Sequence, residues 1–191
     1  MVTGSRIAFT LLIFAVAAAR LVELGVSNRN VRRLTARGAV EAAPGHYPVM
    51  VALHTAFLAA CPAEVWLLDR PFLPWLGWPM LALVLGAAGL RLWVIRALDG
   101  RWTTRIYCLP DTPPVTSGPF RFLRHPNYLA VIVEIVALPL VHTAWLTSAV
   151  FSVANALLLR VRIRAEEAAL AQVSHYRTAF AGRYRLLPGG R

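Results

Sequence analysis

Lysine is absent from this chain of 191 residues, and all 20 of its basic residues are arginine. Acidic residues are also scarce, at 9, so charged residues make up only 15% of the chain against 58% hydrophobic residues. A soluble domain usually has about a quarter charged residues and under half apolar ones. The composition therefore excludes an ordinary soluble globule, and the chain is too apolar to be disordered.

Cysteines are few, and the common cofactor motifs are missing. Cys61 falls in an apolar run and Cys108 in a polar segment, so we expect no disulfide between them. We find no glycine-rich dinucleotide fingerprint and no His, Cys or Asp cluster with metal-ligand spacing, so we expect no metal. The net charge of +11 would suit nucleic acid, but we expect no such partner, because the chain has no recognisable nucleic-acid module.

Long apolar runs dominate the sequence and predict one all-α integral membrane domain over 1–191. About five transmembrane helices are expected, at 7–26, 48–68, 74–98, 128–141 and 144–161. The last two are short, so they can also form a hairpin that crosses the bilayer only partly, or one buried in a soluble core. A cleavable signal peptide is the alternative for the first run, but its apolar pattern continues to Val26, which favours a retained helix.

The arginines are distributed unevenly along the chain. Sixteen of the 20 fall in three segments, 28–46, 96–127 and 160–191, which five crossings would place on one side of the membrane. By the positive-inside rule that side is cytoplasmic, and the N-terminus lies outside. The charge pattern therefore predicts an integral membrane protein with the polar segments 99–127 and 160–191 facing the cytoplasm.

The segment 99–127 has the composition of an ordered, functional loop. Its prolines forbid a long helix, since proline lacks an N–H and restricts the residue before it; they are Pro110, Pro113, Pro114, Pro119 and Pro126. Pro126 suits the first turn of the following helix, where free N–H groups favour an anionic group. Long loops of this kind are disproportionately functional, although a solvated linker is the plain alternative.

Two motifs in the C-terminal half carry a family resemblance. The first is the run Ser117-Gly118-Pro119-Phe120-Arg121-Phe122-Leu123-Arg124-His125-Pro126-Asn127-Tyr128, and the second, after an apolar hairpin, is Arg162-x-x-x-Glu166-Glu167. Together they resemble the isoprenylcysteine carboxyl methyltransferase family over roughly 100–191. The resemblance implies a membrane enzyme that uses S-adenosyl-L-methionine. Its cofactor pocket would be formed by the cytoplasmic loop and the C-terminal helix, and its lipophilic substrate would enter from the bilayer.

The resemblance also implies roles for individual residues. It assigns cofactor contacts to Arg105, Thr112, Pro113, Pro114, Val115, Phe120, His125, Pro126, Asn127, Tyr128 and Glu166. Arg162 would face the substrate. Two positions depart from the family pattern: Phe120 stands where tyrosine is usual, and Leu129-Ala130 stands where glycine is usual, which would reshape the neighbouring tunnel.

The substrate is indicated by a finer resemblance to bacterial members that accompany type III polyketide synthases. It implies O-methylation of an alkylresorcinol, alkylpyrone or quinol-type lipid, with such a synthase as functional partner. Three polar residues deep in the spans, His54, Glu134 and Asn155, fit this substrate class. Ionisable groups at that depth are costly unless they are paired or line a polar cavity. Glu134 and His54 are candidates to orient or deprotonate a phenol, and Asn155, Glu134 and Arg162 are candidates to contact the substrate, with Arg162 also in a catalytic role.

Other interpretations stay open from the sequence alone. Glu134 can instead pair with an arginine of another helix, and Glu23 with Arg91 or Arg20, which would make these charges structural. A prenylcysteine-like carboxylate is the alternative methyl acceptor. An NADPH-dependent membrane reductase of the sterol reductase type is the alternative enzyme, and a membrane scaffold is the non-enzymatic alternative. The sequence does not fix the lipid head group, its chain length or the oligomeric state.

Overall fold

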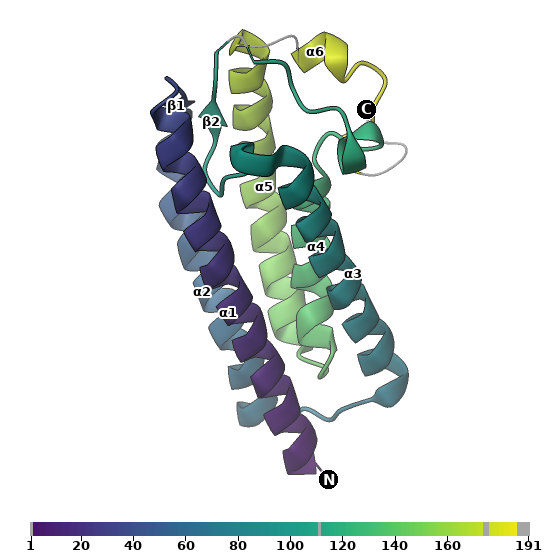
Figure 1. Ribbon diagram of the computed structural model, residues 1–191. Coiled ribbons are helices and arrows are strands. Elements are labelled where there is room, and N and C mark those ends of the chain that lie inside the picture. Colours follow the sequence, from purple (N-terminus) through teal and green to yellow (C-terminus); the bar gives the residue numbers. More distant parts are fainter. Residues whose placement is uncertain (1, 111, 174–175, 187–191) are drawn as a thin grey trace.

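The computed structural model describes residues 2–110, 112–173 and 176–186, and it forms a bundle of four long helices and one shorter one (Figure 1). These are α1 (Val2–Thr35), α2 (Tyr47–Leu67), α3 (Pro74–Leu98), α4 (Pro126–Leu140) and α5 (Trp145–Val173). A short helix α6 (Tyr176–Ala179) lies beside the loop at the end of the bundle that holds the C-terminus. The all-α fold with five helices is confirmed. Asp111 and the residues 174–175 and 187–191 of the predicted cytoplasmic segments lie outside the described residues.

The helices differ from the predicted spans mainly in length. Four of them, α1, α2, α3 and α5, are long and apolar enough to cross a membrane. The fifth span was predicted to be short, whereas α5 has 29 residues, because its helix continues past the apolar run into charged sequence. Only α4 is short, with 15 residues, which rise about 22 Å against a hydrocarbon core of about 30 Å.

Helix α4 lies between α3 and α5, and it is the most enclosed of the five helices (Figure 1). Its side chains Ile135, Ala137 and Leu138 are almost fully buried and pack against Phe57 and Val65 of α2. The outward faces of α1, α2, α3 and α5 carry exposed leucine, valine and tryptophan side chains, as expected of helices that contact lipid. A short helix can therefore be accommodated because its neighbours shield it.

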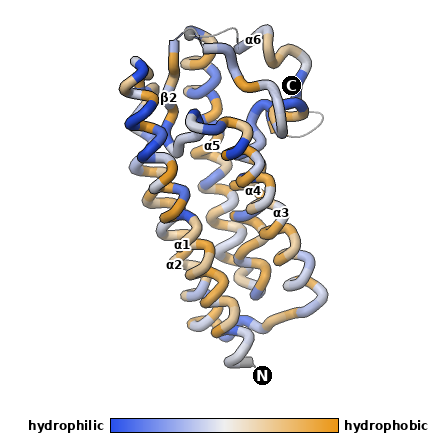
Figure 2. Tube along the Cα trace, in the orientation of Figure 1, coloured by the Kyte–Doolittle hydropathy of each residue, from blue (hydrophilic) through white to orange (hydrophobic). Residues whose placement is uncertain are grey.

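All three arginine-rich segments lie at one end of the bundle, which we call the arginine-rich end. It comprises the chain after α1, the loop 99–125 and the end of α5 with α6, and Figure 2 shows hydrophilic residues gathered there. The loop pairs with the chain that follows α1 in a small antiparallel sheet of two strands, β1 (Val40–Glu41) and β2 (Tyr107–Cys108). Three 3-10 helices, η1 (Pro44–His46), η2 (Asp99–Arg101) and η3 (Gly118–Arg121), complete this end.

A buried carboxylate organises the opposite end of the bundle. Glu64 of α2 is 8% exposed, and it accepts hydrogen bonds from the backbone N–H of Leu146 (3.1 Å) and of Thr147 (2.6 Å). The Thr147 hydroxyl (2.7 Å) and the Arg70 guanidinium (2.9 Å) also donate to it. The first N–H groups of a helix have no partner within the helix, so Glu64 caps α5 from a neighbouring helix.

This arrangement predicts that Glu64→Ala destabilises the protein by about 2–4 kcal/mol, because it leaves the buried N–H of Thr147, the N–H of Leu146 and Arg70 without this acceptor. Thermal unfolding in detergent measures the effect. Glu64→Gln is the matched control, since its amide oxygen can still accept from the helix terminus, and it should cost less. Equal unfolding temperatures for Glu64→Ala and the wild type would contradict the capping role.

Candidate active site

The segment 102–104 of the polar loop is inserted beside α1 at the arginine-rich end. The buried amide of Asn30 donates to the Trp102 carbonyl (2.8 Å), and the Thr104 N–H donates to the Ser27 hydroxyl (2.9 Å). Ser27 and Asn30 lie almost one turn apart on α1, so both side chains face the same strip of loop. These bonds replace the regular backbone pairing that the loop lacks, and they fix the Thr104 carbonyl at the bundle interior.

Arg162 joins four elements at this point. Its Nε donates to the Tyr128 hydroxyl (2.9 Å), its Nη1 approaches the Met50 sulfur (3.2 Å), and its Nη2 donates to the Thr104 carbonyl. The residue is 5% exposed. The Tyr128 hydroxyl in turn donates to the Glu166 carboxylate. The spacing of Arg162 and Glu166 suggests a direct ion pair, but among the described residues the tyrosine hydroxyl lies between them instead.

The two neighbouring glutamates of α5 serve different parts of the structure. Glu166 faces the cavities described below, whereas Glu167 contacts the His125 imidazole (3.0 Å) and the Arg185 guanidinium (2.6 Å). The segment around Tyr184 is also held by two backbone hydrogen bonds: the Arg124 N–H donates to the Tyr184 carbonyl (2.9 Å) and the His125 N–H donates to the Arg185 carbonyl (3.1 Å). The second glutamate therefore helps to hold the chain end over the Arg-His-Pro run.

A glycine is required in this run for steric reasons. Gly118 has a φ of +59°, a backbone conformation that side chains disfavour, and a Cβ there would lie 3.0 Å from the Cβ of Ala97 and 3.2 Å from Trp93 of α3. The turn brings the following residue, Pro119, and then Phe120 inward against the end of α3. This close approach explains the Ser-Gly-Pro sequence locally.

Two cavities adjoin at Glu166. The larger has a volume of about 550 Å³ and runs from the Tyr128–Glu166 contact down between α1, α2 and α5. The smaller, about 170 Å³, lies under the proline-rich part of the loop and is lined by Tyr176, Phe180 and Leu170 of the C-terminal region. Thr103, Arg105 and Glu166 line both, so the two spaces share a wall. Pockets of a few hundred cubic ångströms are the size that cofactors and small ligands occupy.

Buried polar atoms without a hydrogen-bond partner line each cavity. Among the described residues, Asn127 Oδ1 and Asn155 Oδ1 at the larger cavity and the Tyr176 hydroxyl at the smaller one have none. Burial raises the pKa of Tyr176, and the charges of Glu166 and Glu167 raise it further. Burial and then Glu166 likewise raise the pKa of the Cys108 thiol. The cavity junction therefore places the Glu166 carboxylate beside unsatisfied polar atoms, an arrangement that can accept a cationic group of a ligand.

The structure brings together ten of the eleven residues predicted to contact a cofactor. Arg105 and Glu166 line both cavities; His125, Pro126, Asn127 and Tyr128 line the larger one; and Thr112, Pro113, Pro114 and Val115 line the smaller one. Phe120 is the exception, and its contact with the cofactor stays a prediction. It is 8% exposed and packs with Trp102, Tyr176 and Phe180 in a core cluster, so it lines neither cavity.

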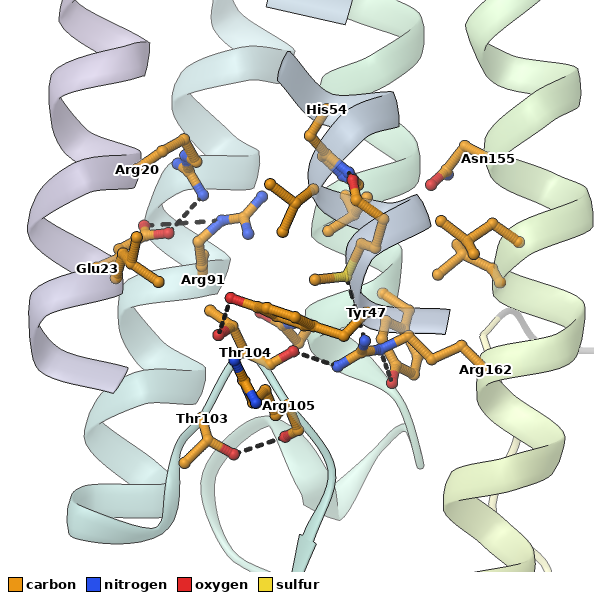
Figure 3. A pocket seen from close by; sticks show the side chains of 18 of the residues that line it. Arg20, Glu23, Tyr47, His54, Arg91, Thr103, Thr104, Arg105, Asn155 and Arg162 are labelled. Atoms are coloured by element: carbon orange, nitrogen blue, oxygen red, sulfur yellow. Dashed lines mark hydrogen bonds and ion pairs between the residues drawn. The ribbon is translucent and has the colours of Figure 1, made fainter. Parts of the chain in front are cut away.

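The deep polar residues divide into two groups. His54, Asn155 and Arg162 line the larger cavity (Figure 3). Glu134 does not, because it is paired with Arg91 of α3 and lies 3.8 Å from Arg20 Nε of α1. The structure therefore shows the alternative in which Glu134 pairs with an arginine of another helix. Glu23 likewise pairs with Arg20 (2.6 Å). The catalytic role of Glu134 stays a prediction, with the carboxylate held behind the cavity wall.

Several cavity residues were missed by the sequence analysis. Tyr47 and Met50 begin α2 and reach the cavity, and Tyr47 lies under the Arg105 guanidinium at 4.3 Å from ring centroid to carbon. Arg105 also pairs with Glu41 (3.2 Å). An aromatic residue directly before an apolar span is ordinary at a membrane interface, so no pattern in the sequence distinguished Tyr47.

Comparison with known proteins identifies the family. Residues 80–172 match the model of the isoprenylcysteine carboxyl methyltransferase family. The chain is 38% identical over 167 residues to the uncharacterized protein YpbQ of Bacillus subtilis, covering 87% of this chain and 98% of that relative. It is 32% identical over 161 residues to an uncharacterized protein of Haemophilus influenzae, covering 83% of this chain and 92% of the relative.

This chain belongs to the isoprenylcysteine carboxyl methyltransferase family. Membership indicates a membrane methyltransferase that uses S-adenosyl-L-methionine, as the two sequence motifs suggested. The match includes α4 and nearly all of α5, and therefore Tyr128, Arg162 and Glu166. The names of the two relatives state no substrate.

The bridging hydroxyl of Tyr128 generates a second prediction. Tyr128→Phe keeps the ring but removes the group that links Arg162 to Glu166, so the free energy of unfolding should fall by about 1–3 kcal/mol. Thermal unfolding of the ligand-free protein in detergent measures this. The matched control is Tyr176→Phe, whose hydroxyl has no partner among the described residues and whose loss should be neutral. Equal unfolding temperatures for the two variants would argue against the bridge.

Proposed function

We propose that this protein transfers a methyl group from S-adenosyl-L-methionine to a ring hydroxyl of a membrane-dissolved lipid. The substrate class is a phenolic or enolic polyketide lipid: an alkylresorcinol, an alkylpyrone or a quinol. The observation that carries the proposal is the 550 Å³ cavity, which connects the polar Tyr128–Glu166 contact to the apolar half of the bundle. A hydroxylated ring with an alkyl tail matches that gradient of polarity.

The cofactor would occupy the junction of the two cavities. Glu166 supplies a carboxylate for a cationic group, while Asn127 and Tyr176 supply unsatisfied polar atoms for its amino, carboxylate or hydroxyl groups. The proline-rich strip 112–115 offers backbone carbonyls and apolar contact around the smaller cavity. These residues fit an elongated, amphiphilic cofactor better than a compact one.

The lipid would enter from the side, between α1 and α2. Leu21 and Leu24 of α1 and Val51 of α2 line the cavity, and each is more than a third exposed on the outer face of the bundle. A side chain that lines the cavity and is also exposed to the membrane marks an opening between them. An alkyl tail can therefore stay in lipid while the ring reaches the interior.

His54 is suited to take the proton that a hydroxyl loses. Its Nδ1 lies 2.8 Å from the Met50 carbonyl, and because a carbonyl only accepts, Nδ1 carries the hydrogen. In the neutral imidazole, Nε2 then has a free lone pair in a residue that lines the cavity. When bound, S-adenosyl-L-methionine supplies a methyl group on a positively charged sulfur. His54 would take the proton that the lipid hydroxyl loses as that oxygen accepts the methyl group, and the cavity walls would hold the hydroxyl in position.

The membrane orientation and the supply of substrate are further parts of the proposal. The arginine-rich end would face the cytoplasm by the positive-inside rule, so the cofactor junction would be reached from inside a bacterial cell. A type III polyketide synthase would provide the lipid as a functional partner. The enzyme would then modify a product that partitions into the bilayer as it is released.

The direct test incubates the purified protein in detergent with S-adenosyl-L-methionine labelled on its methyl group and a panel of lipids. The panel contains alkylresorcinols, alkylpyrones, quinols and prenylcysteines, and we expect label in the first three classes. Thermal shifts with S-adenosylhomocysteine and with NADP test the cofactor separately, and only the former should stabilise the protein. Label in prenylcysteine alone would overturn the substrate class, and a shift with NADP alone would overturn the reaction.

A further prediction separates the two adjacent glutamates. Glu166→Gln removes the charge at the cavity junction and should weaken S-adenosylhomocysteine binding about 10-fold or more, since hydrogen bonds to charged groups contribute about 1.5–3 kcal/mol. Glu167→Gln is the matched control, because it faces His125 and Arg185 and should lower stability rather than affinity. Calorimetric titration measures both. Equal losses of affinity in the two variants would count against the assignment.

A further inference from the structure

Four charged residues form a closed set inside the bundle, which we call the charge quartet: Arg20 and Glu23 of α1, Arg91 of α3 and Glu134 of α4. Arg20 Nη1 donates to Glu23 (2.6 Å) and Arg91 Nη2 donates to Glu134, while Glu23 Oε1 lies 3.9 Å from Arg91 Nε and Glu134 Oε1 lies 3.8 Å from Arg20 Nε. Two cations and two anions balance. Such a set is costly to bury, so it is retained for a structural or a functional reason.

The quartet forms part of the wall of the larger cavity. Arg20, Glu23 and Arg91 line that cavity, and Figure 3 shows them on the side opposite Asn155 and Arg162. Glu134 lies behind Arg91, at a small space of about 40 Å³ that Arg20, Arg91 and His54 also line. A purely structural set of ion pairs would not need to border the space in which a ligand sits.

The guanidinium groups have more donors than the quartet has acceptors in reach. Each guanidinium carries five N–H groups. Among the described residues, hydrogen bonds are made only from Arg20 Nη1 and Arg91 Nη2, and both Nε atoms are buried without an acceptor. Arg91 is 7% exposed. The two Nε atoms face carboxylates of the quartet at 3.8 Å and 3.9 Å, so the donors left for a ligand are the remaining Nη groups of Arg20 and Arg91, whose complement is an oxygen atom.

The charge quartet lies where it can contact the far side of a lipid ring whose hydroxyl is bound at His54. Glu23 precedes Ser27 by one helical turn, about 6 Å. The Ser27 hydroxyl accepts a hydrogen bond from the Thr104 N–H, and the Thr104 carbonyl accepts one from the Arg162 guanidinium. The quartet thus lies about one turn deeper than Arg162, and His54 borders both the large cavity and the small space beside Glu134.

We propose that the charge quartet is a headgroup subsite that binds a second oxygen of the lipid ring. The guanidinium N–H groups of Arg20 and Arg91 donate to that oxygen, and the Glu23 carboxylate accepts from it where it is a hydroxyl. Glu134 is a positioning residue that holds Arg91. The subsite selects rings with two oxygen substituents over monohydric phenols, and it rests on the function proposed above.

The test compares two ligands that differ by one hydroxyl: a 5-alkylresorcinol and a 3-alkylphenol of the same chain length. Dissociation constants are measured in detergent with saturating S-adenosylhomocysteine, and labelled methyl transfer to each lipid is measured in parallel. We expect the wild type to bind the resorcinol at least about 10-fold more tightly, the scale of a hydrogen bond to a charged group. This comparison needs no variant and is unaffected by folding defects.

A paired variant then assigns the preference to the quartet. Arg91→Gln combined with Glu134→Gln keeps the charge balanced and should reduce the preference for the resorcinol to about 2-fold or less. The control, Arg70→Gln combined with Glu64→Gln, removes an ion pair with a buried carboxylate at the opposite end of the bundle and should keep the full preference.

The outcomes separate the two proposals. Equal affinities of the wild type for the two lipids, binding of neither, or a preference that survives in the Arg91/Glu134 variant would each overturn the subsite. If the wild type prefers the resorcinol but methylates neither lipid, the subsite stands and the proposed reaction fails. If it binds both lipids with equal affinity and methylates both, the reaction stands and the subsite fails.

Discussion

The structure depends on the desolvated guanidinium of Arg162. By contacting Met50, the Thr104 carbonyl and the Tyr128 hydroxyl, it joins α2, the polar loop and α4 to its own helix, α5. A buried cation is costly unless its donors find acceptors, so these elements must adopt one arrangement for the charge to be tolerated. That arrangement leaves Glu166 to accept from Tyr128, and it sets the point where the two cavities meet.

Charge inside the bundle is handled in three different ways. The Glu64 carboxylate caps the first turn of α5. In the charge quartet around Arg91, each charged group is paired with one of opposite sign. The side chain of Glu166 is 28% exposed and borders the cavities. The first is a requirement of helix ends, and the second keeps charged groups paired at membrane depth. The third leaves a carboxylate at the junction of the two cavities, where we propose that the cofactor binds.

The local motifs were recognisable because they are contiguous. Ten of the eleven residues predicted to contact a cofactor line the cavities, among them the His-Pro-Asn-Tyr run and Glu166, and the apolar runs predicted the five helices of the bundle. Phe120 could not be placed in this way, since its orientation depends on the turn at Gly118 and on the aromatic cluster with Trp102. The length of α5 was also underestimated, because a hydropathy pattern marks the apolar span and not the end of the helix.

The sequence by itself determined the membrane character, the number of helices and the gathering of the arginines at one end, since these follow from composition and from the alternation of apolar runs with charged loops. Only the tertiary structure decided how the charges were used. Glu134 and Arg91 are 43 residues apart in the chain, and Tyr128 and Arg162 are 34 apart. Whether a buried charge is paired, capping or open to a cavity depends on which helices pack side by side, because interactions in a dry interior are decided by contacts of a few ångströms.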